Sequence, residues 1–127
     1  MAHRYRVRKE SLPDDALIVL RGGLLEFNSL RADADAAATR FGLPGISVFG
    51  APDDAAVEKL GATRLVRFDV LTLVTAGDIR TAGLEVLPTF RRPHYTVLLP
   101  DLVDDLYRLL ACDTVVRINP SYRAPEG

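Results

Sequence analysis

The sequence predicts one α+β domain, with a mixed, twisted sheet and short helices packed on it. Short apolar runs rich in β-branched residues alternate with amphipathic segments along the chain. The amphipathic segments are too few to place a helix of about 10–15 residues between every pair of strands, which argues against a doubly wound parallel sheet. The chain has 127 residues, 48% of them apolar, and no linker divides it, so residues 1–127 are expected to form a single domain.

The first third of the chain predicts an edge strand, a central strand and a helix. Residues 3–9 alternate basic with other residues, which is typical of an edge strand protected by charge or of a stripe facing phosphates. Residues 16–20 form a continuous apolar run, typical of a buried central strand. Asn28 or Ser29 can cap the helix that follows, and Gly42 is the residue type expected to end it.

The middle of the chain predicts a helix between two strands. Residues 46–49 follow a proline–glycine turn and form a short apolar strand. Pro52 stands at the start of the helix with two carboxylates beside it, which suits the positive end of a helix dipole, and Gly61 ends the helix. Residues 65–70 alternate apolar with charged side chains, which predicts a half-buried strand.

The last third predicts two helices and three strands. Thr75 opens a capping box for a short helix that ends at Gly83. An apolar run lies between Pro93 and Pro100, and because both prolines interrupt strand pairing, this run predicts a short buried strand. The remaining expected elements are strands at 84–87 and 114–118 and a helix capped by Asp101.

Composition restricts the classes of function. The net charge of −1 gives the whole molecule no strong attraction to polyanions or acidic membranes. Cys112 is the only cysteine, which excludes an internal disulfide and a cysteine-based zinc site, and the acidic cluster at residues 101–105 is read as ordinary helix-dipole partners, so no metal is predicted. No run reaches membrane-spanning length and no signal peptide precedes the domain, so a cytoplasmic location is expected.

The strongest chemical signal is a histidine beside two arginines. His94 opens the proline-bounded strand, directly after Arg91, Arg92 and a proline. In one hypothesis the protein is a metal-independent ribonuclease, with His94 as acid or base and the two arginines stabilising the phosphorane. Tyr95 or Tyr122 would assist. The triplet at 94–96 is also half of a two-histidine phosphoesterase signature, which needs a second copy that this chain lacks.

Residues 16–70 contain a further pattern. An apolar strand ends in Arg21-Gly22, a helix follows, and a glycine-led strand carries Ser47 before another helix and an alternating strand. This order resembles the first half of small bacterial toxins of the ADP-ribosyltransferase superfamily. The resemblance implies NAD as cofactor, with Arg21 on its phosphates and Ser47 shaping the nicotinamide site. Gly22 would allow backbone N–H groups to approach the pyrophosphate.

The same resemblance implies a glutamate on a late strand, which holds the ribose. Glu85 is the only late-strand candidate, and no Glu-x-Glu or Gln-x-Glu pair accompanies it. The leading prediction is a toxin-like enzyme that acts on NAD or a nucleotide-containing substrate, with Glu85 from this resemblance and His94 and Tyr95 from the residues themselves as catalytic residues. A third hypothesis is a non-catalytic module that binds a partner protein by strand addition at residues 3–9, or an antitoxin- or immunity-like protein. The expected partners are a cognate antitoxin or another protein, and a nucleotide or RNA substrate.

Overall fold

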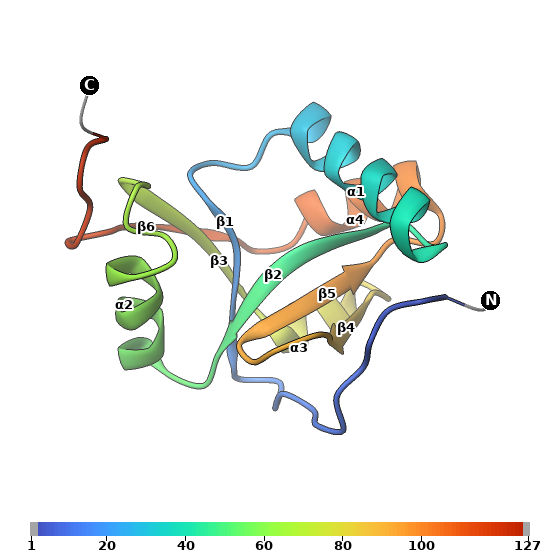
Figure 1. Ribbon diagram of the computed structural model, residues 1–127, viewed down its shortest axis with the longest axis horizontal. Coiled ribbons are helices and arrows are strands. Elements are labelled where there is room, and N and C mark those ends of the chain that lie inside the picture. Colours follow the sequence, from blue (N-terminus) through green and yellow to red (C-terminus); the bar gives the residue numbers. More distant parts are fainter. Residues whose placement is uncertain (1–2, 126–127) are drawn as a thin grey trace.

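One six-stranded sheet carries the fold across residues 3–125, the part of the chain that the computed structural model describes (Figure 1). The strands lie in the order β4-β5-β2-β1-β3-β6. They are β1 (Leu17–Gly22), β2 (Gly45–Ala51), β3 (Val70–Thr75), β4 (Glu85–Pro88), β5 (His94–Leu98) and β6 (Val115–Ile118). The helices of this range are α1 (Phe27–Phe41), α2 (Asp54–Ala62), α3 (Ala76–Thr81) and α4 (Leu102–Leu110). The predicted α+β class is confirmed.

Every strand pairing in the described sheet is antiparallel, whereas the sequence predicted a mixed sheet. Parallel neighbours need a connection that crosses back along the sheet. Here β1 ends and β2 begins at the same end of the sheet, because the two strands are antiparallel neighbours. Helix α1 packs on the sheet and returns the chain to the same end, so it does not serve as a crossover (Figure 1).

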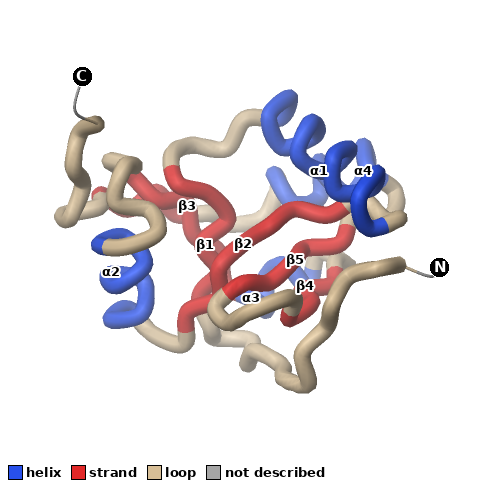
Figure 2. The backbone as a smooth tube through the Cα atoms, viewed as in Figure 1, coloured by secondary structure: helices blue, strands red, loops and turns tan. Residues whose placement is uncertain are grey.

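The two faces of the sheet are covered differently (Figure 2). Helices α1, α3 and α4 pack on one face and enclose the larger core, whose fully buried members include Ile18, Leu20, Leu30, Ile46, Ile79, Leu99, Leu106 and Leu109. Helix α2 packs on the opposite face, which we call the α2 face, and encloses a second cluster with Val19, Val57, Leu71 and Leu73. The N-terminal segment covers β4 and β5 on the same α2 face.

Alternation along β2 and β5 determines which side chains reach the α2 face. Ile46 and Val48 of β2 face the larger core, so Ser47 and Phe49 lie on the α2 face. The register places Phe49 opposite His94 and Ser47 opposite Thr96. Ser47 is exposed, while Phe49 and His94 are half-buried, so this part of the sheet is less covered than its surroundings.

The prediction of a strand at residues 65–70 is wrong. The chain forms hydrogen-bonded turns there, and strand β3 begins only at Val70. The side-chain amide of Asn119 is the physical reason. Its Nδ2 donates to the carbonyl oxygens of Gly61, Leu65 and Phe68, at 2.9, 3.1 and 3.0 Å. Those carbonyls lie close together around one buried amide, which an extended strand cannot arrange.

Replacing Asn119 by alanine is expected to lower the free energy of unfolding by about 2 kcal/mol, because buried carbonyls lose their donor. Urea denaturation measures the change. Asn119→Asp should be at least as damaging, since a carboxylate cannot donate. Ser121→Ala is the matched control in the same turn and should stay within about 0.5 kcal/mol of wild type. A stable Asn119→Ala protein would show that the turn does not depend on this amide.

Helix boundaries partly follow the predicted caps. Gly42 ends α1 in a left-handed conformation, with φ of 83°, and Thr75 caps α3 by accepting from the Asp78 N–H, both as predicted. The cap of α1, however, is Glu26, whose carboxylate accepts from two backbone N–H groups. At α4 the predicted cap, Asp101, makes no side-chain capping bond. Instead, the buried carboxylate of Asp105 accepts a hydrogen bond from the Asp101 backbone N–H.

Residues 3–9 are extended but do not form the predicted edge strand. Their backbone pairing with the sheet is limited to one bridge, between Val7 and Thr89. Tyr5 is buried, stacks on Phe41 and donates its hydroxyl to the Leu43 carbonyl at 2.9 Å. The segment is thus a strap across the α2 face, anchored by side chains.

Candidate functional site

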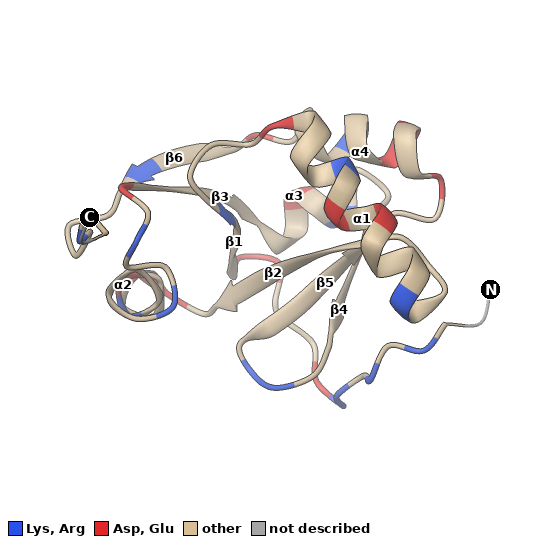
Figure 3. Ribbon diagram, turned by 45° about the horizontal axis from the view of Figure 1, so that its top comes forward, with Lys and Arg blue, Asp and Glu red and all other residues tan. Residues whose placement is uncertain are grey.

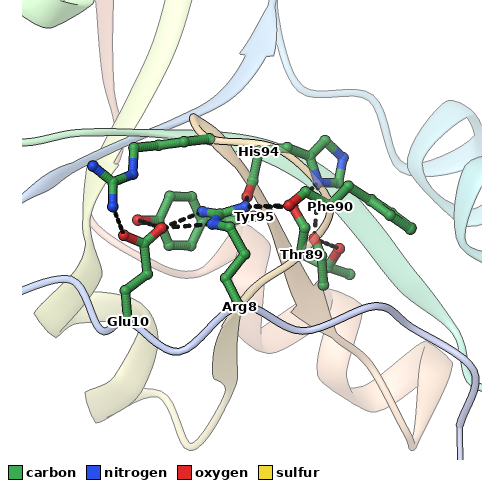
Figure 4. Close-up of polar contacts among 8 residues, drawn as sticks. Arg8, Glu10, Thr89, Phe90, His94 and Tyr95 are labelled. Atoms are coloured by element: carbon green, nitrogen blue, oxygen red, sulfur yellow. Dashed lines mark hydrogen bonds and ion pairs between the residues drawn. The ribbon is translucent and has the colours of Figure 1, made fainter.

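His94 is held at the start of β5 by the turn that joins β4 to β5. Its Nδ1 lies 2.8 Å from the Thr89 hydroxyl and 3.3 Å from the Thr89 carbonyl oxygen (Figure 4). Because a carbonyl can only accept, this geometry favours the tautomer with the proton on Nδ1. Two phenyl rings lie near the imidazole, with centroid distances of 5.1 Å to Phe90 and 6.4 Å to Phe49. The arrangement leaves the Nε2 lone pair to act as a base.

The environment of His94 keeps the ring neutral at pH 7. Burial is the largest cause and lowers the pKa below its usual value of 6.5, because the charged imidazolium loses solvation. The bond to the Thr89 backbone acts in the opposite direction, and the positive charges of Arg8 and Arg64 lower the pKa further. A neutral imidazole with one fixed nitrogen is the form that a general base requires.

Arg8 fixes the turn that carries His94. One guanidinium nitrogen, Nη1, donates to the carbonyl oxygens of Thr89, Phe90 and His94 at 2.6, 3.2 and 2.9 Å. Its Nε donates to Glu10 at 2.7 Å. These carbonyls need a donor because Phe90 stands in a left-handed conformation, with φ of 57°, and turns the backbone away from regular pairing. Arg8 therefore acts as scaffold and not as part of a phosphate-facing stripe.

Glu10 connects this scaffold to two further side chains (Figure 4). It accepts from Arg92 at 2.6 Å and from the Tyr95 hydroxyl at 3.3 Å. The hydrogen bond from Arg8 is the largest cause that lowers the pKa of Glu10, so the carboxylate is ionised at neutral pH. Arg8 also lies over the Tyr95 ring, 5.0 Å from its centroid. The network joins the N-terminal strap, the turn and β5 into one unit.

A basic hollow of about 430 Å³ lies between α2 and the β4–β5 turn. It is lined by three cations, Lys59, Arg64 and Arg92, and otherwise by Gly50, Pro52, Ala56, Leu60, Thr63 and Pro93. Figure 3 shows basic residues on both flanking elements. No carboxylate lines the hollow, and within residues 3–125 Lys59 and Arg64 form no ion pair. We call this feature the basic hollow.

Phe49 links the basic hollow to His94. The Arg64 guanidinium lies over the Phe49 ring, 5.6 Å from its centroid, and the imidazole of His94 contacts the same ring edge to face. His94, Phe49 and Arg64 therefore form a row across the α2 face. Arg64 lines the hollow, whereas Phe49 and His94 lie beside it, so the row connects a neutral base to a cationic site, which suits a sugar with its phosphate.

The residues predicted for a cofactor are brought together only in part. Arg21 and Ser47 line one smaller hollow of about 210 Å³, together with Arg40. The Arg21 guanidinium is paired with Asp33 of α1, so its charge already has a partner. Gly22 lies under the Phe68 ring, where an added Cβ would come within 2.3 Å of a ring carbon. The glycine is thus required for packing at that point.

The three predicted catalytic residues do not share one site. Tyr95 follows His94 in the strand and therefore faces the opposite side of the sheet, where it is buried in the larger core. Burial raises its pKa. Glu85 is exposed on β4 opposite Leu98, four residues along β5 from His94, and lines a separate hollow. Both lie away from the imidazole.

The predicted arginine pair is divided between two roles. Arg92 reaches the basic hollow while also donating to Glu10. Arg91 is exposed and contributes its carbonyl oxygen, which accepts from the His94 backbone N–H at 2.8 Å. Tyr122, an alternative assisting residue, lines another hollow beside Pro120.

Sequence reasoning missed Lys59, Arg64 and Phe49. Lys59 lies in a helix whose apolar residues face the sheet, which indicates an outward position but no partner. Its approach to Arg92, 33 positions later, depends on where β5 pairs. Phe49 could have been assigned to the same face as Ser47 from strand alternation alone.

The described residues contain no cluster of three or more histidine, cysteine, aspartate or glutamate side chains able to hold a metal ion. No helix within residues 3–125 has the length and apolar character needed to cross a bilayer. Comparison of the chain with protein-family models, with curated proteins and with solved structures gives no match.

Proposed function

We propose that this protein binds RNA at the basic hollow and cleaves it without a metal ion, with His94 as the general base. The observation that carries the proposal is the row from His94 through Phe49 to Arg64, at the edge of a hollow lined by three cations. A volume of about 430 Å³ falls in the range of small-molecule sites and can accommodate a nucleotide unit.

The charges of the hollow suit a phosphodiester. Arg64 and Arg92 supply planar donors that can contact two phosphate oxygens at once, and Lys59 adds a compact positive charge. Because Lys59 and Arg64 have no carboxylate partner among the described residues, an incoming phosphate does not have to displace one. The Arg64 guanidinium lies over the Phe49 ring and presents its own planar surface, on which a base can stack.

The proposed reaction uses the ribose itself as nucleophile. Nε2 of His94 takes the proton of a 2′-hydroxyl, and the freed oxygen attacks the adjacent phosphorus. The bond from phosphorus to the 5′ oxygen breaks, and that oxygen takes a proton from water. The cations stabilise the negative charge of the phosphorane. The products are a 2′,3′-cyclic phosphate and a 5′-hydroxyl, and DNA, which lacks the 2′-hydroxyl, is not cleaved.

Cleavage of a short RNA oligonucleotide in EDTA, with products identified by mass spectrometry, tests the reaction. The DNA oligonucleotide of the same sequence is the control substrate. Wild-type protein is expected to release a cyclic phosphate from RNA and to leave DNA intact. Absence of RNA cleavage, or equal cleavage of both substrates, would contradict the proposal.

Binding to the hollow can be tested apart from chemistry. Lys59→Gln and Arg64→Gln are each expected to weaken RNA binding and to reduce the salt dependence of the association constant by about one phosphate contact. Fluorescence anisotropy at several salt concentrations measures both. Lys9→Gln, at the only other lysine, is the matched control and should leave the salt dependence unchanged. Unchanged binding in both hollow variants would remove the basic hollow from the proposal.

A second candidate function is an ADP-ribosyltransferase-like reaction with NAD. It is favoured by the placement of Arg21 and Ser47 in one hollow. Calorimetric titration with NAD distinguishes it: binding that is lost in Arg21→Ala and retained in Arg64→Gln would support this candidate over RNA cleavage. Wild-type protein that does not bind NAD would dismiss it.

A further inference from the structure

The sheet ends at β6, and this edge is unusually apolar. Val115, Val116 and Ile118 are 60%, 51% and 77% exposed, so three of the four strand residues present apolar side chains to solvent. Exposed edge strands are normally protected by lysine, proline or a bulge. Here the single charge, Arg117, is already paired with Asp54 of α2 at 3.0 Å. The edge is therefore apolar and electrically neutral.

The pattern of pairing with β3 shows which backbone groups of β6 face outward. The Asn119 N–H donates to the Asp69 carbonyl at 2.8 Å, so Asn119 points its backbone groups towards β3. In an antiparallel ladder every second residue does the same, which assigns Arg117 and Val115 to β3 as well. The backbone groups of Val116 and Ile118 point away from the sheet and offer donors and acceptors to another strand.

We propose that β6 pairs antiparallel with β6 of a second copy of this chain, around a two-fold axis that passes through Val116. Val116 then lies opposite its own copy, and the other opposed pairs are Thr114 with Ile118 and Val115 with Arg117. The outward-facing backbone groups of Val116 and Ile118 are used in this register. The two sheets join into one continuous sheet, and the exposed apolar side chains become covered.

Charge and backbone geometry select this register. Opposed residues share a face of the sheet, so a symmetric axis must pass through a residue and cannot fall between two. An axis through Arg117 would place two guanidinium groups directly opposite each other, which is unfavourable. An axis through Val115 would pair β6 with residues 112–114, where the Thr114 N–H turns back to the Cys112 carbonyl. The axis through Val116 keeps the guanidinium groups apart and places Thr114 only at the ends of the ladder, where its carbonyl oxygen can still accept although its N–H is engaged.

A second copy is the occupant that the charges favour. The edge is self-complementary and neutral, and the chain carries a net charge of only −1, so two copies repel each other little. Isologous pairing is also the commonest form of protein self-association.

Sedimentation analysis across a range of protein concentrations tests the dimer. Wild-type protein is expected to be dimeric, and Val116→Lys to be monomeric, because that change places two ammonium groups opposite each other at the axis. Val103→Lys makes the same substitution at an exposed valine of α4 and should remain dimeric. A wild type that is monomeric throughout, or a Val116→Lys protein that stays dimeric, would overturn the proposal.

Disulfide trapping tests the register. In a Cys112→Ser background, Val116→Cys is expected to cross-link between copies on oxidation, because directly opposed residues bring their Cα atoms within about 5.5 Å. Val115→Cys and Arg117→Cys would cross-link readily only if the two-fold axis passed through residue 115 or 117. Both variants should therefore cross-link far less than Val116→Cys. Preferred cross-linking of either of these variants would overturn the register, and failure of all three would overturn the pairing itself.

Discussion

Arg8→Ala is expected to lower the free energy of unfolding by about 3–4 kcal/mol, the largest loss of stability expected from any single side chain of the strap. The guanidinium is only partly exposed and serves three carbonyls of the β4–β5 turn together with the carboxylate of Glu10. Removing it leaves those acceptors without their shared donor. Urea denaturation measures the loss.

Two further variants separate the role of this guanidinium from the general effect of removing charge. Arg6→Ala lies in the same strap, and its contact with the turn is made by its backbone carbonyl, which the substitution retains. It should change stability by less than about 0.5 kcal/mol. Arg8→Lys should be nearly as damaging as alanine, since a single ammonium cannot reach all the acceptors at once. Equal stability of Arg8→Ala and Arg6→Ala would refute the scaffold role.

His94→Gln is expected to reduce RNA cleavage by about 10²–10⁴-fold while leaving RNA affinity nearly unchanged, because the base is lost and the cations of the hollow remain. Single-turnover cleavage and anisotropy binding, measured on the same preparation, give the two quantities. His3→Gln is the matched control at the only other histidine. Thr89→Val, which removes the hydroxyl beside Nδ1, should give an intermediate loss. If His94→Gln cleaves RNA at the wild-type rate, the assignment of the base is wrong.

The pH dependence of the cleavage rate should reflect the titration of His94. Since burial lowers the pKa of His94 below 6.5, the base is neutral and active at pH 7, and the rate should fall only when the pH drops below that usual value. Stability should change in the same direction. The unfolded chain binds the proton at a higher pH than the folded one, so stability is complete above 6.5 and is lost as the pH falls towards the lowered pKa. His94→Gln should lose this contribution.

Local patterns in the sequence predicted much of the fold. Gly42 and Thr75 act at helix ends as their residue types require, and the proline-bounded run forms a buried strand. The failures have a common physical cause. Residues 65–69 alternate like a strand, but a distant amide at Asn119 gathers their carbonyls into turns. A period-two pattern cannot reveal a competitor that lies 50 or more residues away.

The candidate site was predictable in one part and not in another. The strand period alone separates His94 from Tyr95, since neighbouring strand residues face opposite sides, and it also places Phe49 beside the histidine once the two strands pair. No local rule could predict Arg8 as scaffold, because its three carbonyl acceptors lie 81 to 86 positions away. The basic hollow could not be predicted for the same reason, because α2 and the β4–β5 turn, which line it, are far apart in the sequence.

The strap has a consequence for biosynthesis. Arg8 leaves the ribosome more than eighty residues before the last carbonyl that it must bind. Until that late segment has been made, the guanidinium and its acidic companion have no carbonyl acceptors in the turn, and the chain does not yet contain the imidazole of His94. A nascent chain, or a fragment that stops before residue 94, therefore cannot assemble the turn beneath the strap, whereas removing the first ten residues from a finished molecule should release the turn and leave the central strands paired.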